Sequence, residues 1–227
     1  MNLWRQLDIL PEDKLKTPII VIGAGGIGSM LVLLLAKMGF ENITVYDPDT
    51  IEDHNIPNQM LPYWSKYDNE TCKTYKTVGG EKVWALGELA RHITGEDHYT
   101  GISTRYDGKL APIIISGVDS MESRSGIWQS IRMQTECKLY IDARMGSETC
   151  AVYTIKPYAI DDINFYEKTL YSDVEASQES CTAKAIIYNT AFIGSIIASR
   201  VKNYLVGVKN KREIIAEITT LDILTRD

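Results

Sequence analysis

The sequence contains few of the residues on which metal centres and disulfide frameworks depend. It has only three histidines and four cysteines among 227 residues. Because no Cys-x-x-Cys pair is present and no histidine stands at ligand spacing from a cysteine, a zinc knuckle and a thioredoxin-like motif are excluded. Unpaired cysteines are typical of a reducing compartment. They stand at Cys72, Cys137, Cys150 and Cys181.

Basic residues and long apolar runs are scarce as well. Lys and Arg number 24 against 30 Asp and Glu, which gives a net charge of −6. Nucleic-acid-binding proteins usually show a basic excess or stripe, so we expect no nucleic-acid partner. The longest apolar run, around residues 30–36, is too short to span a bilayer, and the N-terminus lacks the pattern of a signal peptide. We therefore expect a cytoplasmic protein with no membrane partner.

Short β-branched apolar runs alternate with helical patterns along the chain, which predicts an α/β fold. The runs lack polar alternation, as in strands buried on both faces of a parallel sheet. The predicted sheet is Rossmann-like and mostly parallel, is flanked by helices, and gains antiparallel strands toward the C-terminus. Predicted strands cover residues 18–22, 43–46, 113–115, 139–141, 150–155 and 213–221. Predicted helices cover residues 29–38, 81–92, 121–136 and 183–205.

Two segments, residues 50–80 and 156–180, are polar and show no clear periodicity. Long loops within compact domains are often functional. With no internal repeat and no low-complexity linker, residues 1–227 are predicted to form a single domain with two functional loops.

A glycine-rich segment follows the first predicted strand. Gly23, Gly25 and Gly28 fit Gly-x-Gly-x-x-Gly, and Gly26 adds a further glycine. In this pattern the glycines allow a tight turn, close approach to a phosphate and close packing of helix on strand, while the helix N-terminus attracts the anion. Asp47 ends the second predicted strand, where an acid can bond ribose hydroxyls. The pattern predicts a nucleotide site, and NAD and ATP both fit it.

The residues that follow discriminate between these nucleotides. Residues 45–59 read Val-Tyr-Asp-Pro-Asp-Thr-Ile-Glu-Asp-His-Asn-Ile-Pro-Asn-Gln. With the glycine segment, this stretch resembles the ThiF/MoeB/ubiquitin-activating-enzyme superfamily, whose usual form is Gly-x-Gly-Gly-x-Gly, then Asp-x-Asp, then Asn-x-x-Arg-Gln. The resemblance continues through Gly79-Gly80-Glu81-Lys82, through Asp119 with Arg124, and to Cys181.

This resemblance implies adenylation of the C-terminal carboxylate of a ubiquitin-like or sulfur-carrier protein, with ATP and Mg²⁺ as cofactors. Asp47 would hold the ribose, Lys82 would neutralise phosphate charge, and Asp119 would bind Mg²⁺, which favours a carboxylate together with phosphate oxygens. Zinc is not expected, because the paired cysteines that many members carry are absent. The implied nucleotide-binding residues are Gly23, Gly25, Gly26, Gly28, Asp47, Asp49, Asn55, Asn58, Gln59, Lys82 and Asp119.

Two further residues are implied to take part in catalysis beside Lys82 and Asp119. Cys181 opens a predicted helix, where the dipole stabilises a thiolate, and it matches the position at which several members carry an acyl-accepting cysteine. Arg5 resembles the arginine that members donate across a dimer, so we expect a homodimer with residues 1–17 as its arm. Residues 156–180 would form the crossover loop that threads the Gly-Gly tail of the partner protein. Arg124 is interpreted as a supporting residue.

One departure from the family pattern leaves alternatives open. Asn58 stands where members commonly have an arginine that contacts phosphates, so the site lacks one charge-assisted contact. A binding module without catalysis is therefore one alternative. Adenylation of a small carboxylate, a peptide or a tRNA base is another. An NAD(P)-dependent oxidoreductase is a third, although it leaves the residues from Asn55 to Gln59 and Lys82 without a role.

Overall fold

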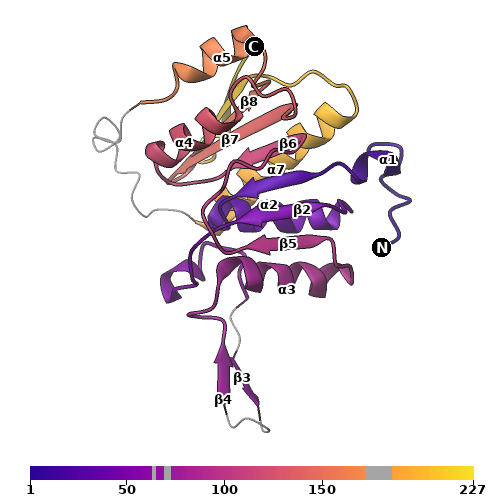
Figure 1. Cartoon of the computed structure of the whole chain (residues 1–227), viewed down its shortest axis with the longest axis vertical. Coiled ribbons are helices and arrows are strands. Elements are labelled where there is room, and N and C mark those ends of the chain that lie inside the picture. Colours follow the sequence, from indigo (N-terminus) through magenta and orange to yellow (C-terminus); the bar gives the residue numbers. More distant parts are fainter. Residues whose placement is uncertain (63–64, 69–72, 172–185) are drawn as a thin grey trace.

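The computed structural model describes residues 1–62, 65–68, 73–171 and 186–227, with the backbone alone described at 65–68 and 73–76. Its main feature is an eight-stranded sheet in the order β10-β9-β8-β7-β6-β1-β2-β5 (Figure 1). From β5 to β7 neighbouring strands are parallel, and from β7 to β10 they are antiparallel. The strands are β1 (Ile19–Ile22), β2 (Ile43–Tyr46), β5 (Tyr99–Ile102), β6 (Ile113–Ser116), β7 (Leu139–Gly146), β8 (Thr149–Ile155), β9 (Glu213–Glu217) and β10 (Asp222–Arg226).

Helices cover both faces of this sheet, and the described residues also include a separate hairpin that projects from the body of the molecule (Figure 1). The helices are α1 (Glu12–Leu15), α2 (Gly26–Lys37), α3 (Lys82–Thr94), α4 (Met121–Ile131), α5 (Ile160–Glu167) and α7 (Ile187–Leu205), with a short 3₁₀ helix η1 (Asp53–Asn55). The hairpin consists of β3 (Ser65–Asp68) and β4 (Lys73–Lys76). The predicted α/β architecture with antiparallel strands toward the C-terminus is confirmed.

Alternate residues of the central strands divide the core into two layers. Ile19 and Val21 of β1 pack in one cluster with α2, α3 and α7, whereas Ile20 and Ile22 pack in another with α4 and α5. Every residue of β1 is buried, because side chains of successive residues point to opposite faces and each face carries helices. Burial on both faces is why the residues of this strand do not alternate between apolar and polar.

Several predicted boundaries were wrong. Strand β5 was missed, because its residues Tyr-Thr-Gly-Ile form a half-exposed edge without an apolar run. The helix predicted over 121–136 ends at Ile131, since Arg132 is extended and Met133 has a φ of 63° while its N–H donates to the carbonyl of Pro157 at 2.8 Å. The strand predicted over 213–221 ends at Glu217 and turns into β10.

The two segments predicted as irregular also contain regular structure. Residues 156–180 include α5, which buries only Asp162, Ile163 and Tyr166 and therefore gives a weak periodic signal. Residues 50–80 include η1 and the β3–β4 hairpin. The helix predicted from residue 29 begins three residues earlier, within the glycine segment, and the one predicted from 183 is described only from Ile187.

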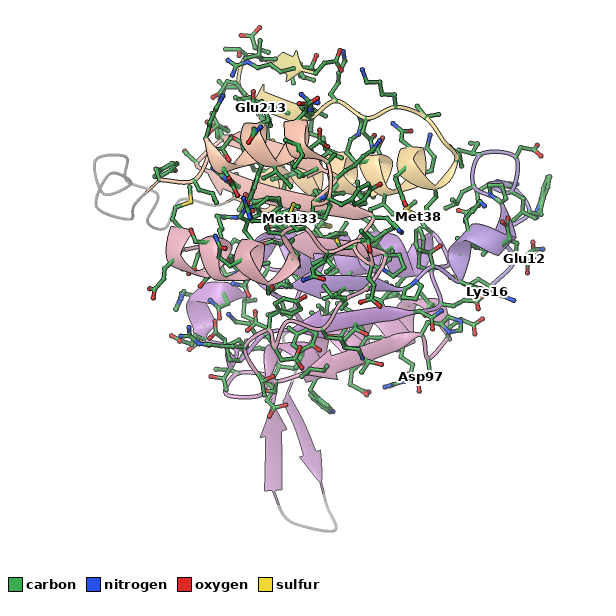
Figure 2. The ribbon with its side chains drawn as sticks, turned by 45° about the horizontal axis from the view of Figure 1, so that its top comes forward. Glu12, Lys16, Met38, Asp97, Met133 and Glu213 are labelled. Carbon is green, nitrogen blue, oxygen red and sulfur yellow. The ribbon has the colours of Figure 1, made fainter. Side chains whose placement is uncertain are left out.

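The N-terminal residues lie against the C-terminal end of α2. The side-chain amide Nε2 of Gln6 donates to the carbonyl of Met38 at 2.5 Å, and Leu3 packs closely over Gly39. Figure 2 shows Glu12, Lys16 and Met38 on the same side of the molecule. Because α2 begins at the carboxyl end of β1, this side is opposite to the glycine segment.

Candidate functional site

The glycine segment forms the turn between β1 and α2, and its glycines meet different constraints. At Gly28 a Cβ would lie 1.8 Å from the carbonyl oxygen of Gly23, so no side chain fits there. Gly23 itself has a φ of 98°, a left-handed conformation that favours glycine. A Cβ at Gly25 would meet no atom within 4 Å, and Gly25 is the N-cap of α2. Among the described residues, therefore, the approach to the helix N-terminus at Gly25 is open to a phosphate group.

Asp47 fixes the conformation of this turn. Its Oδ2 accepts a hydrogen bond from the backbone N–H of Ala24 at 2.6 Å, and its Oδ1 accepts one from the N–H of Asp49 at 2.8 Å. Burial of the carboxylate, which is 6% exposed, raises its pKa, although the two amide hydrogen bonds oppose this effect. Asp47 thus connects β2 to the glycine segment. A ribose contact, as predicted, would use lone pairs that these amides leave available.

Lys82 is linked to Asp47 through Asp49. It is the first residue of α3, is 7% exposed, and its Nζ lies 2.9 Å from Oδ2 of Asp49. Its backbone N–H also donates to the carbonyl of Asp49 at 3.0 Å. The carboxylate of Asp49 is 62% exposed, so solvent reaches one partner of this ion pair and not the other. Hydrogen bonds and the ion pair therefore join Ala24, Asp47, Asp49 and Lys82 into one group.

The Asn-to-Gln stretch lies against the beginning of α2. The carbonyl of Asn58 is 3.1 Å from the position of a Cβ on Gly26, and the N–H of Met60 donates to Oγ of Ser29 at 2.9 Å. Within the described residues, the buried side-chain oxygens of Asn58 and Gln59 have no hydrogen-bond partner. Buried acceptors without donors suit the hydroxyl or amino groups of a nucleotide.

Asn55 has a local structural contact. Its Oδ1 accepts a hydrogen bond from the N–H of Glu52 at 2.9 Å, which closes a capping box around η1. The backbone carbonyl of Asn55 accepts from the N–H of Gln59 at 3.0 Å. Asn55 therefore shapes the loop that holds Gln59, and its predicted contact with phosphate stays a prediction.

Asp119 lies beyond the end of β6, next to the glycine segment. The carbonyl of Gly117 is 3.1 Å from the position of a Cβ on Gly23, which brings the ends of β6 and β1 together. Asp119 is exposed, and over the described part of the chain no three His, Cys, Asp or Glu side chains gather as a metal site. A single exposed carboxylate fits Mg²⁺, because this ion completes its shell with phosphate oxygens and waters. Its role as a ligand stays a prediction.

An ion cluster beside the end of β6 was not found by sequence reasoning; its acid, Asp142, lies within β7 opposite Ser116, the last residue of β6. Asp142 is 0% exposed and lies between two arginines: Nη1 of Arg124 is 2.5 Å from its Oδ1, and Nε of Arg144 is 2.8 Å from its Oδ2. Burial works against the charge of Arg144, but the charge and hydrogen bonds of Asp142 outweigh it, so the pKa of Arg144 is raised. The sequence signal was an Asp and an Arg at alternate positions of one strand.

Arg5 is not brought to this edge, and two cysteines cannot be placed because they lie outside the described residues. Arg5 is exposed, with its guanidinium 5.7 Å from the ring centroid of Trp4, on the opposite side of the molecule. Cys181 and Cys72, the latter a weaker candidate nucleophile from the sequence, are the two cysteines concerned, and residues 172–180 of the predicted crossover loop are likewise outside the described residues. Cys137 and Cys150 are buried free thiols, and burial raises their pKa to about 12 and about 11.

Comparisons with known proteins identify the family. The ThiF family pattern matches residues 10–227. This chain belongs to the ThiF family. A probable molybdopterin-synthase adenylyltransferase from Gracilaria tenuistipitata var. liui is 26% identical over 208 residues, which is 88% of this chain and 54% of that protein. The adenylyltransferase and sulfurtransferase UBA4 of Candida albicans is 29% identical over 105 residues, or 42% of this chain and 22% of that protein.

Solved structures agree with this assignment at the level of the fold. The crystal structure of E. coli MccB with AMPCPP and MccA superimposes with a TM-score of 0.70 at 18% identity, and the match covers 95% of this ThiF-family chain and 65% of MccB. The chain thus spans about half or less of the curated relatives described above. None of the helices that the structure describes has the length and apolar character needed to cross a membrane.

Proposed function

We propose that this ThiF-family chain uses MgATP to adenylate the C-terminal carboxylate of a ubiquitin-like or sulfur-carrier protein. The observation that carries the proposal is the connected group of Ala24, Asp47, Asp49 and Lys82. It joins the glycine segment, the Asp-x-Asp segment and the helix lysine of the family pattern at one edge of the sheet. A buried lysine beside this turn favours ATP, because a polyphosphate needs neutralisation.

In the proposed reaction, a carboxylate oxygen of the tail attacks the α-phosphorus of ATP. The bond from this phosphorus to the bridging oxygen breaks, and pyrophosphate leaves with the electron pair. The N–H groups at the start of α2 bind phosphate oxygens, and Lys82 exchanges Asp49 for a phosphate oxygen. Asp119 and Asp47 orient the nucleotide at its phosphate and ribose ends. Mg²⁺, when bound at Asp119, would neutralise charge on the leaving pyrophosphate.

The proposal also includes a role for Cys181 and one for Arg5. Cys181 would accept the acyl group from the adenylate, with AMP as the leaving group. Arg5 lies far from the nucleotide site of its own chain, and this placement supports its donation to a second copy in a homodimer. Neither residue belongs to the group of Ala24, Asp47, Asp49 and Lys82, so each role needs a test of its own.

Exchange of labelled pyrophosphate into ATP tests the adenylation step. Exchange should depend on a small protein that ends in Gly-Gly, and Asp119→Ala should abolish it. Asp97→Ala is the matched control, because Asp97 is exposed and paired with Arg91 away from this site. Exchange without any carrier protein would instead favour a small carboxylate as the substrate. Persistence of full exchange in Asp119→Ala would show that Asp119 is wrongly assigned.

Thioester trapping tests the second step separately. Cys181→Ala should keep pyrophosphate exchange and lose the reducible adduct with the carrier protein. Cys137→Ala serves as the control, because that thiol is buried. An adduct that survives Cys181→Ala would show that another residue accepts the acyl group.

A further inference from the structure

The cluster of Arg124, Asp142 and Arg144 has a charge excess that its own contacts do not remove. Two guanidinium groups share one carboxylate, so the cluster carries a net charge of one positive unit. Arg144 also stacks over Tyr153, with its Cζ 4.4 Å from the ring centroid. Arg124 is buried and the side chain of Arg144 is 14% exposed, so solvent screens this charge only in part and it stabilises an anion nearby.

The contacts of the two arginines lead in different directions. Arg124 donates to the carbonyls of Ala143 and Val118, and Val118 directly precedes Asp119. Arg144 donates through Nη1 to the carbonyl of Thr169 at 2.8 Å and through Nη2 to its Oγ1 at 3.0 Å. Thr169 lies just after α5. Arg124 therefore acts on the end of β6, and Arg144 acts on the backbone that leaves α5.

The order of strands assigns places to the two substrates of the proposed reaction. Along the sheet the strands follow in the order β2, β1, β6, β7. Asp47, the glycine segment and Asp119 follow the carboxyl ends of β2, β1 and β6, while Asp142 lies within β7 opposite Ser116, the last residue of β6. ATP bound as proposed would occupy the ends of β2, β1 and β6. The carboxylate that attacks its α-phosphate must then approach from the next strand, β7, where Arg144 and Thr169 lie.

We infer that Arg144 is a positioning residue for the carboxylate of the incoming tail, and this inference rests on the proposed function. The two Nη atoms of its guanidinium hold Thr169 beside β7, and the excess charge of the cluster favours a negatively charged chain end there. The cluster also supplies, on the tail side, a positive charge that Asn58 does not supply on the nucleotide side. Arg124 positions Asp119 through Val118. In this inference Arg124 therefore acts on the nucleotide side and Arg144 on the tail side.

Binding measurements with two peptides test this inference without relying on turnover. The probes are a fluorescein-labelled octapeptide that ends in Gly-Gly with a free carboxylate and the same peptide as a C-terminal carboxamide. Wild-type protein should bind the free acid more tightly. Arg144→Met should weaken binding of the acid by about tenfold to a hundredfold, the range for a charged hydrogen bond, and leave the carboxamide unaffected. MgATP affinity, measured by calorimetry, should stay within about twofold.

Further variants separate this role from a structural one. Arg144→Lys should keep the preference for the acid, because the charge remains although the fork is lost. Arg132→Met is the matched control, since Arg132 forms only an exposed pair with Glu167 among the described side chains, and neither probe should respond. If Arg144→Met fails to fold, Arg144→Lys still decides the question. Loss of the preference in that variant would overturn the inference.

Two other outcomes would overturn it. Equal loss of affinity for MgATP and for both peptides in Arg144→Met would show that Arg144 only stabilises the fold. Wild-type protein that fails to prefer the acid over the carboxamide would also refute a carboxylate-positioning role. In that case pyrophosphate exchange with a carrier protein would still uphold the proposed function, whereas its absence would refute that function on separate grounds.

Discussion

The two sides of the sheet edge obtain their order in different ways. On the side of β1 and β2, the turn is made of glycines and braced by backbone N–H groups that donate to Asp47, and its nearest cation, Lys82, is paired with Asp49. On the side of β6 and β7, the buried side chains of Arg124 and Asp142 lie with Arg144, whose side chain is 14% exposed. The first side leaves space near Gly25, while the second is filled. The comparison teaches that one sheet edge can be ordered by glycines and backbone hydrogen bonds on one side and by charged side chains on the other.

The largest expected effect comes from Gly28→Ala on the glycine side. A Cβ there would lie 1.8 Å from the carbonyl oxygen of Gly23, so the turn must open. We expect the free energy of unfolding to fall by more than about 4 kcal/mol, as measured by urea denaturation. Gly25→Ala is the matched variant, because its Cβ meets no atom within 4 Å. It should cost no more than about 1 kcal/mol and weaken ATP binding; equal destabilisation by both variants would contradict the packing argument.

The charged side should show the next largest effect. Asp142→Ala leaves two buried guanidinium groups without their shared carboxylate, and we expect a loss of about 3–5 kcal/mol in the free energy of unfolding. Replacing Arg124, Asp142 and Arg144 together by apolar residues should cost less than Asp142→Ala alone. Thermal denaturation of the two proteins measures the difference. A triple variant that is less stable than Asp142→Ala would show that the cluster stabilises the fold as a unit.

A cation placed at position 58 would make the glycine side resemble the charged side. Asn58→Arg should tighten ATP binding by about tenfold, because it adds a charge-assisted hydrogen bond to phosphate. Asn58→Gln is the control that keeps an amide. Calorimetric titration with MgATP measures both. Unchanged affinity in Asn58→Arg would mean that this position does not reach the phosphates.

The smallest effect concerns the two buried thiols. Their pKa values of about 12 and about 11 lie above the ordinary value of 9.0, so at pH 8 iodoacetamide should leave Cys137 and Cys150 unmodified in the folded protein. Because folding favours the protonated thiols, their contribution to stability is present below pH 9 and is lost as the pH rises toward 11 and 12. Mass spectrometry of alkylated peptides checks the first expectation. Modification of Cys137 ahead of the other cysteines would show that its surroundings open readily.

The elements with strong local signals could be predicted from the sequence. Strand β1 and the turn after it were predicted because buried β-branched residues followed by spaced glycines leave few alternatives. Strand β5 and helix α5 were not, because tertiary contacts rather than their own residues define them. The Arg144 cluster could not be predicted for a similar reason. The pairing of β6 with β7 brings Arg124 close to Asp142, whereas Thr169 reaches Arg144 from the residues that follow α5, so no local pattern contains all the partners.

The shared carboxylate of Asp142 has a consequence for how this chain can change over generations. Loss of either arginine alone leaves a neutral pair of one arginine and Asp142. Loss of Asp142 alone leaves two arginines side by side without a carboxylate between them. Loss of Asp142 before the arginines therefore leads through a poorly folded intermediate. Descendants of this chain should keep Asp142 for as long as both arginines are present.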